Sequence, residues 1–286
     1  MKSKFFNSFF TALCILATMM ACQPKKNDDT ESKKDDPVKD KPATQQQIDC
    51  NYCDANDTYK IELDEALSLI CAFHNNVLKN HPNITNAGGI FSLTEFDQAD
   101  KINFNDYATA KFHWALEDSS SAKGKRLFIT YEPSNNICNS ITPGIEGANL
   151  YTTYADNDIA PLIDKSTNLD RNQALRGLAR TFSIKQKHFR KAAKKTADSL
   201  LSNFKSDGIL TSLYKCDDVV FNYGLTLRAI EAETHSEQFL YFFGYEEKNT
   251  SHKLRLIVAG LDERNQLVFY AADGASLMRE TSRPHP

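Results

Sequence analysis

Six short blocks of sequence occur twice, in the same order, between residues 50 and 286. Each block carries apolar and polar residues in a similar arrangement, and the gaps between blocks differ in length. The matched blocks are 66–73 with 197–204, 89–93 with 208–213, Asp97 with Asp217, 111–114 with 238–241, 126–129 with 255–258, and 149–156 with 266–273. Recurrence in a fixed order indicates an internal duplication, with chance similarity of short apolar blocks as the alternative.

Each repeat, residues 50–158 and residues 190–286, is expected to contain one amphipathic helix, a short helical or irregular segment and three strands. In the second repeat the strands are expected at Gln238–Tyr245, Leu254–Leu261 and Gln266–Ala272, with a tight polar turn over residues 262–265. Short links between successive strands predict an antiparallel meander. The nearly continuous apolar runs predict that both faces of these strands are covered.

Between the repeats, apolar residues recur every three or four positions up to Phe204. This spacing predicts one long connecting helix, assigned to residues 159–189, or two helices broken near Ser183. Asn168 or Asp170 is a suitable N-cap. The predicted fold class is therefore α+β: a tandem duplication of a helix plus an antiparallel three-stranded meander, joined by a long helix.

The first 21 residues have the features of a secretory signal peptide. Lys2 and Lys4 give a basic start, and residues 9–21 form an apolar run that is short for a membrane span and ends in the small residue Ala21. The next residue is Cys22, so the segment 19–22 resembles the signal of bacterial lipoproteins. That resemblance implies cleavage before Cys22 and lipidation of its sulfur, whereas an ordinary signal peptide with a chance cysteine is the alternative.

Residues 23–49 support the lipoprotein interpretation, because they contain no aromatic residue and are dominated by charged and amide side chains. Such a segment buries too little apolar surface to offset its ordering entropy, so a disordered tether over residues 22–49 is expected. The acidic tract resembles the export signals of Bacteroidota surface lipoproteins. It implies a lipid anchor in the cell outer membrane, with the folded part exposed at the surface or facing the periplasm.

The folded part resembles small Bacteroidota proteins built from a helix, a linker and a three-stranded meander. The resemblance rests on the aromatic strand Phe239–Tyr245 and on residues 254–262, which end in a Gly-Leu-Asp turn. It implies an α+β fold and no particular activity.

The cysteines offer a possible metal site. Cys50 and Cys53 lie three positions apart, as do Cys71 and His74, which is a spacing found in zinc sites. Outside the cytoplasm, however, a disulfide among Cys50, Cys53 and Cys71 is favoured over thiolate ligands. Free thiols, with Cys71 as a small core residue, are the third interpretation. No metal and no cofactor is expected.

A basic segment offers a possible binding surface for anions. Its candidate residues are Lys187, Arg190, Lys191, Lys194 and Lys195. On one helical face these cations would attract anionic glycans, lipopolysaccharide phosphates or nucleic acid. The expected partner is an envelope protein or an anionic glycan. The alternative is a solvated face behind the apolar residues of the same helix.

The sequence contains no His-Glu-x-x-His motif, no Gly-x-Ser-x-Gly motif and no phosphate-binding glycine loop. His113 alternates with Phe112 and Trp114, so it is expected to face away from them and to be exposed to solvent. The net charge of −3 gives no general attraction to nucleic acid.

These observations predict a lipid-anchored cell-envelope protein that binds or scaffolds a partner, without enzymatic activity. A cell-envelope hydrolase with its site between the two repeats is the alternative. Convergent Asp, Glu or His side chains in a cleft would favour the hydrolase.

Overall fold

The fold is described by a computed structural model in which eleven segments of the chain are placed. These segments are residues 60–92, 109–118, 124–134, 151–152, 159–183, 190–191, 194–215, 218–221, 227–236, 238–249 and 252–280. The predicted signal peptide, the predicted tether and residues 135–150 lie outside them.

The strands form two antiparallel sheets. In the first sheet, sheet A, the order is β1 (Gly88–Ser92), β7 (Gln238–Tyr245), β8 (Leu254–Gly260) and β9 (Arg279–Glu280). In the second, sheet B, the order is β5 (Arg190–Lys191), β4 (Tyr151–Thr152), β3 (Lys125–Ser134), β2 (Thr109–Asp118) and β6 (Asp218–Phe221).

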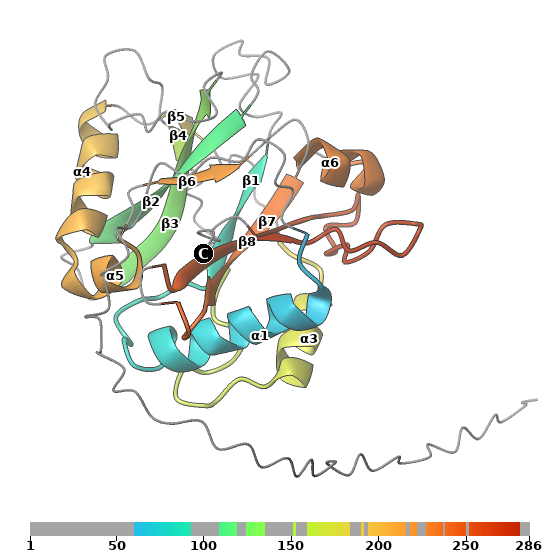
Figure 1. Ribbon diagram of the computed structural model, residues 1–286, viewed down its shortest axis with the longest axis horizontal. Coiled ribbons are helices and arrows are strands. Elements are labelled where there is room, and N and C mark those ends of the chain that lie inside the picture. Colours follow the sequence, from blue (N-terminus) through green and yellow to red (C-terminus); the bar gives the residue numbers. More distant parts are fainter. Residues whose placement is uncertain are drawn as a thin grey trace, which may run out of the picture. The chain divides into compact units, whose positions relative to one another are not determined.

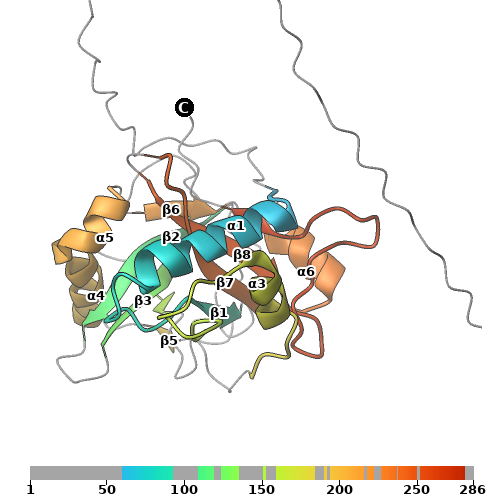
Figure 2. The same ribbon diagram turned by 90° about the horizontal axis from the view of Figure 1, so that it is seen from below.

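The helices lie around these sheets (Figures 1 and 2). They are α1 (Leu63–Phe73), α3 (Arg171–Leu178), α4 (Lys194–Ser206), α5 (Gly208–Leu213) and α6 (Arg228–Thr234), and a π-helical turn, η1 (His74–Leu78), continues α1. α1 packs on β7 of sheet A, and α4 packs on β2 of sheet B. Helices and antiparallel sheets together confirm the predicted α+β class. None of the helices in the described segments has both the length and the apolar character needed to cross a membrane.

The two sheets face each other across an aromatic core. From sheet B, Phe112 and Trp114 point into this core, and from sheet A the core receives Phe239 and Phe243. The rings of Trp114 and Phe243 have centroids 5.7 Å apart, so the two sheets are in direct contact. Aromatic pairs at this separation add to the stabilisation from apolar burial.

The outer face of each sheet is covered by helices. Ile257 and Ala259 of β8 pack with Ile70 of α1 and Leu178 of α3, whereas their neighbours Leu256 and Val258 face the aromatic core. On sheet B, Ala115 and Phe128 pack against Leu201 of α4. The prediction that both faces of these strands are covered is therefore confirmed.

Two glycines allow β1 to approach β7 closely. A Cβ atom on Gly88 would lie 2.0 Å from the carbonyl oxygen of Tyr241, and one on Gly89 would lie 2.2 Å from the Tyr241 hydroxyl. Since non-bonded atoms do not approach this closely, only glycine fits both positions.

Several predicted elements are confirmed. The helix expected at residues 66–73 lies within α1, and the strands expected at Gln238–Tyr245 and Leu254–Leu261 are β7 and β8. The polar turn also forms, with the Asn265 amide donating to the Asp262 carbonyl at 2.9 Å. Asp170 caps α3 in a reciprocal capping box with Gln173.

Three expectations are wrong. Residues 266–272 form isolated bridges instead of a strand: Leu267 bridges back to Leu261, Tyr270 bridges to Ser276, and β9 takes the expected place beside β8. The sequence blocks match residues 89–93 to residues 208–213. Residues 208–213 form helix α5, but residues 88–92 form strand β1, so the two blocks do not have the same structure.

The single long connecting helix is also wrong. α3 ends at Leu178, after which Thr181 bridges to Gln266 and the Phe182 amide donates to the Asn265 carbonyl. Extended backbone at this point is incompatible with a continuous helix, and α4 begins only at Lys194.

Candidate functional site

The predicted site residues are placed unequally by the structure. Cys22, Cys50, Cys53 and Lys187 lie outside the described segments. Lipidation of Cys22 therefore stays a prediction from sequence, and the complete Cys-Cys-Cys-His set cannot be assembled from described residues.

Cys71 is a buried, free thiol on α1. It packs with Ile70 and Ala174, and burial, followed by the negative charge of Asp170, raises its pKa. A raised pKa keeps the thiol protonated and weakens it as a nucleophile or metal ligand. The neighbouring His74 directs Nε2 toward the Thr167 carbonyl oxygen at 3.0 Å. In the described segments no three His, Cys, Asp or Glu side chains gather as a metal site.

The basic segment does not follow one helical face, so that expectation is wrong. Arg190 and Lys191 form β5, the last described strand at one edge of sheet B, where they pair with β4. Lys194 is the first residue of α4, and Lys195 in its first turn is exposed. The basic residues thus run from a sheet edge into the start of a helix.

A row of polar residues crosses sheet B in register. Asp218 of β6 lies opposite His113 of β2, His113 opposite Thr130 of β3, Thr130 opposite Thr152 of β4, and Thr152 opposite Arg190 of β5. Sequence reasoning missed this row, because it depends on pairing between strands that are up to about 100 residues apart.

His113 is the central residue of the row, and the expectation that it is exposed is wrong. It does face away from Phe112 and Trp114, but α4 packs over that side of β2, and only 2% of the residue is exposed. An imidazole between a carboxylate position and a hydroxyl is an arrangement used in nucleophilic catalysis. Thr130, however, is 0% exposed, so a substrate has no access to its hydroxyl and the burial favours a structural role.

Sheet A carries a second set of buried polar residues at its β8–β9 edge. Arg255 forms ion pairs with Glu246, just after β7, and with Glu280 of β9, where Nε and Oε1 are 3.5 Å apart. Arg279 donates from Nη1 to the carbonyl oxygens of Ser276 and Met278, and burial lowers its pKa. The Arg255 guanidinium thus links β8 to β9 and to the residue after β7, whereas the Arg279 guanidinium binds carbonyl groups of the segment that leads into β9.

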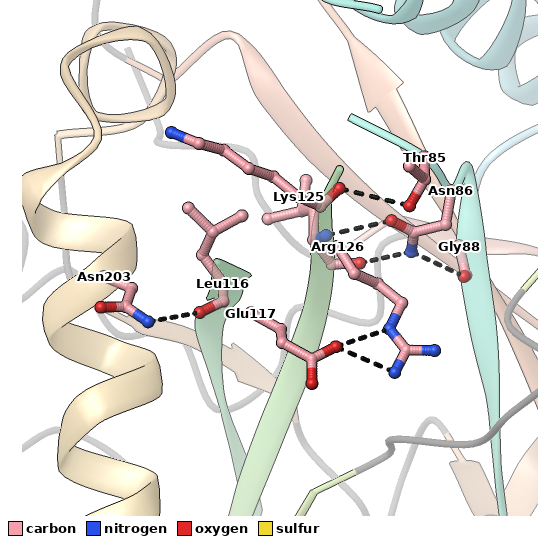
Figure 3. A network of polar contacts seen from close by, with 9 residues as sticks. Thr85, Asn86, Gly88, Leu116, Glu117, Lys125, Arg126 and Asn203 are labelled. Carbon is pink, nitrogen blue, oxygen red and sulfur yellow. Dashed lines mark hydrogen bonds and ion pairs between the residues drawn. The ribbon is translucent and has the colours of Figure 1, made fainter. Parts of the chain in front are cut away.

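Asn86 joins the two sheets (Figure 3). Its Oδ1 accepts from the Leu127 amide of β3 at 3.0 Å, while its Nδ2 donates to the carbonyl oxygens of Leu127 and Gly88. The Asn86 side chain thus makes the backbone hydrogen bonds to β3 that a neighbouring strand would make. It does so at the point where the chain enters β1. Just before Asn86, the Thr85 amide donates to the Lys125 carbonyl at 3.0 Å.

α4 and α5 are attached to the same strands by polar contacts. Asn203 of α4 donates to the Leu116 carbonyl of β2 at 3.2 Å (Figure 3). Lys125 pairs with Asp207 at 2.7 Å. Asp207 also accepts from the amides of Ile209 and Leu210 at the start of α5. Burial alone would raise the pKa of Asp207, but Lys125 and these amides hold it below its ordinary value.

His252 is buried where the chain enters β8. Its ring meets the Tyr214 ring edge-on, with centroids 5.0 Å apart. Burial, helped by the positive charges of Arg255 and Lys215, lowers the pKa of His252 from 6.5 to about 4. The imidazole is therefore neutral in the folded protein near pH 7.

The described polar groups thus brace sheets and helices, and the basic segment at the β5 edge is the candidate surface for binding. Comparison with known proteins adds no further assignment: no protein-family model, no curated protein and no solved structure matches this chain.

Proposed function

We propose that this protein is a lipid-anchored module of the cell envelope that binds a partner and has no enzymatic activity of its own. The observation that carries the proposal is the order of sequence features at the N-terminus: a basic start, a short apolar run, Ala21, Cys22 and a charged tether. The lipid attaches the chain to the outer membrane, and the tether allows the folded part to stand away from it.

The packing between the sheets supports binding over the alternative, a hydrolase with its site between the repeats. That hydrolase requires acidic or histidine side chains converging in a cleft. The space between sheet A and sheet B instead receives aromatic side chains, among them Phe91, Phe112 and Tyr241. Rings of Phe91 and Phe112 from different sheets have centroids 5.8 Å apart, which is contact distance for aromatic pairs.

A duplicated architecture is part of the proposal. Two repeats, each a helix followed by an antiparallel meander, are supported by three of the matched sequence blocks, which coincide with α1 and α4, β2 and β7, and β3 and β8. The register agrees as well. Trp114 of β2 lies opposite Ile129 of β3, and Tyr241 of β7 lies opposite Val258 of β8. The sequence blocks match Trp114 to Tyr241 and Ile129 to Val258.

Replacing Cys22 by alanine should abolish lipidation. Because the thioether and the N-terminal acyl group both require this cysteine, labelled palmitate supplied to a Gram-negative host should enter the wild-type protein and not the variant. Cys50→Ala serves as the control, since it removes another cysteine close to the tether and should keep the label. Equal labelling of the Cys22→Ala variant and the wild type would show that the anchor assignment is wrong.

The proposed partner is an anionic glycan or another anionic envelope component, bound at the basic segment. Reversing charge at Lys191 and Lys195 should greatly reduce retention on an immobilised acidic polysaccharide, and retention of the wild type should fall with salt. Lys60→Glu combined with Lys248→Glu makes the same change in net charge at two exposed lysines away from the segment. If the two double variants lose retention equally, the segment is not the binding surface.

A further inference from the structure

The strands of the two proposed repeats are interleaved. In sheet A, β7, β8 and β9 come from the C-terminal half of the chain, but their neighbour β1 comes from the N-terminal half. In sheet B the situation is reversed: β2, β3 and β4 come from the N-terminal half, whereas β6, which pairs with β2, and the short β5, which pairs with β4, come from the C-terminal half. By their place in the topology β1 and β6 correspond, because each precedes its own meander and pairs with the first strand of the other one, whereas the sequence blocks match β1 to α5.

The helices follow the same exchange. α1 of the N-terminal half packs on β7, and α4 of the C-terminal half packs on β2. Phe73 at the end of α1 lies 5.5 Å from Phe243 of β7, measured between ring centroids. The matched residue Phe204 of α4 stacks on Trp114 of β2 at 6.2 Å.

The segments that cross between the sheets are also equivalent. Before β1, the Lys125 amide at the start of β3 donates to the Asn83 carbonyl at 2.6 Å. Before β6, the Lys253 amide just ahead of β8 donates to the Leu213 carbonyl at 2.7 Å. Since β3 and β8 are matched strands, each crossing segment contacts its own repeat before its strand joins the other one.

From these three observations we infer that each half of the chain packs its helix and its first strand on the meander of the other half. Each half is therefore the binding partner of the other. The inference rests on the proposed duplication. It adds that the repeats are not separate domains: a half alone leaves β2 or β7 as an uncovered edge and its apolar helix face without a sheet. Uncovered edges of this kind bind other strands. The two halves should therefore stay bound as separate polypeptides.

The test uses the whole chain with a protease site inserted among residues 184–189, between the halves. Ser92→Cys and Gln238→Cys are introduced together, because these residues are directly opposite in β1 and β7. Opposed positions in antiparallel strands have Cα atoms about 4.5–5.5 Å apart, a separation that a disulfide spans. After oxidation and cleavage, the halves should run as one linked species on a non-reducing denaturing gel and as two after reduction.

A second pair, Lys111→Cys with Val220→Cys, tests the reverse exchange between β2 and β6. The cleaved chain without added cysteines, and the chain with Ser92→Cys alone, measure any link through native cysteines. Separation of the halves in both engineered chains overturns the exchange and leaves the proposed duplication standing, because repeats can also pack side by side. If only one pair links the halves, the arrangement is not reciprocal and the proposed exchange is overturned, while the duplication again stands. Neither result bears on labelling at Cys22.

Discussion

Replacing Asn86 by alanine should lower the free energy of unfolding by about 2–6 kcal/mol. The amide side chain satisfies both the N–H and the C=O of Leu127, and Asn86 is buried, so water cannot replace it. Leaving one buried polar group without a partner costs about 1–3 kcal/mol, and here two are left. Denaturant unfolding followed by circular dichroism measures the loss.

Asn76→Ala is the matched control. Asn76 is also an asparagine with one donor bond to a backbone carbonyl, that of Ala72, but it is exposed on the helix surface. Its replacement should change stability by less than about 0.5 kcal/mol, as is usual for surface sites. Equal losses for the two variants would mean that Asn86 does not bridge the sheets.

Acidification from about pH 7.5 to about pH 5 should cost about 2 kcal/mol of stability through His252 alone. The folded state holds the pKa of His252 at about 4, against 6.5 in the unfolded chain. Between these values the unfolded chain binds the proton and the folded protein does not. The stabilising contribution is therefore complete above pH 6.5 and is lost as the pH falls toward 4.

His252→Phe isolates this effect, because phenylalanine keeps an aromatic edge contact with Tyr214 and does not titrate. The variant should lose about 2 kcal/mol less than the wild type over the same pH interval, measured by denaturant unfolding at each pH. Equal pH dependence of the wild type and His252→Phe would contradict the assignment.

The sequence allowed prediction of those elements whose signals are local. Residues 238–245 and 254–261 read as strands because they are apolar on both faces, and both faces are in fact covered. Asp170 was recognisable as a cap from its position before a periodic run. The α+β class followed from the order of helical and strand signals.

The remaining parts depend on contacts between distant segments. From the sequence alone, β1 is an ordinary glycine-containing segment. Glycine is needed at positions 88 and 89 because of the contact with Tyr241, more than 150 residues away. The alternation around His113 gave the correct face of β2, but nothing local indicates that α4 covers that face. Tyr270 belongs to an apolar run that resembles a strand, yet it is 46% exposed where the chain turns back through Gly274.

The candidate surface was affected in the same way. A periodic apolar stripe suggested that the basic residues share a helix, but Arg190 and Lys191 pair as strand β5 with Thr152 and Tyr151. Pairing with another strand overrides the local helical preference, as tertiary contacts commonly do.

Native-state hydrogen exchange tests most directly the claim that both repeats form one interleaved body. Trp114, the single tryptophan of the chain, lies in the core between the sheets and reports global unfolding by its fluorescence. The account predicts that the slowest amides of β2, β3, β7 and β8 exchange through one common opening, with a free energy equal to that reported by Trp114. The contrary result is an opening in which the amides of residues 109–134 exchange while those of residues 238–260 stay protected. That result would show two independent units and contradict the account.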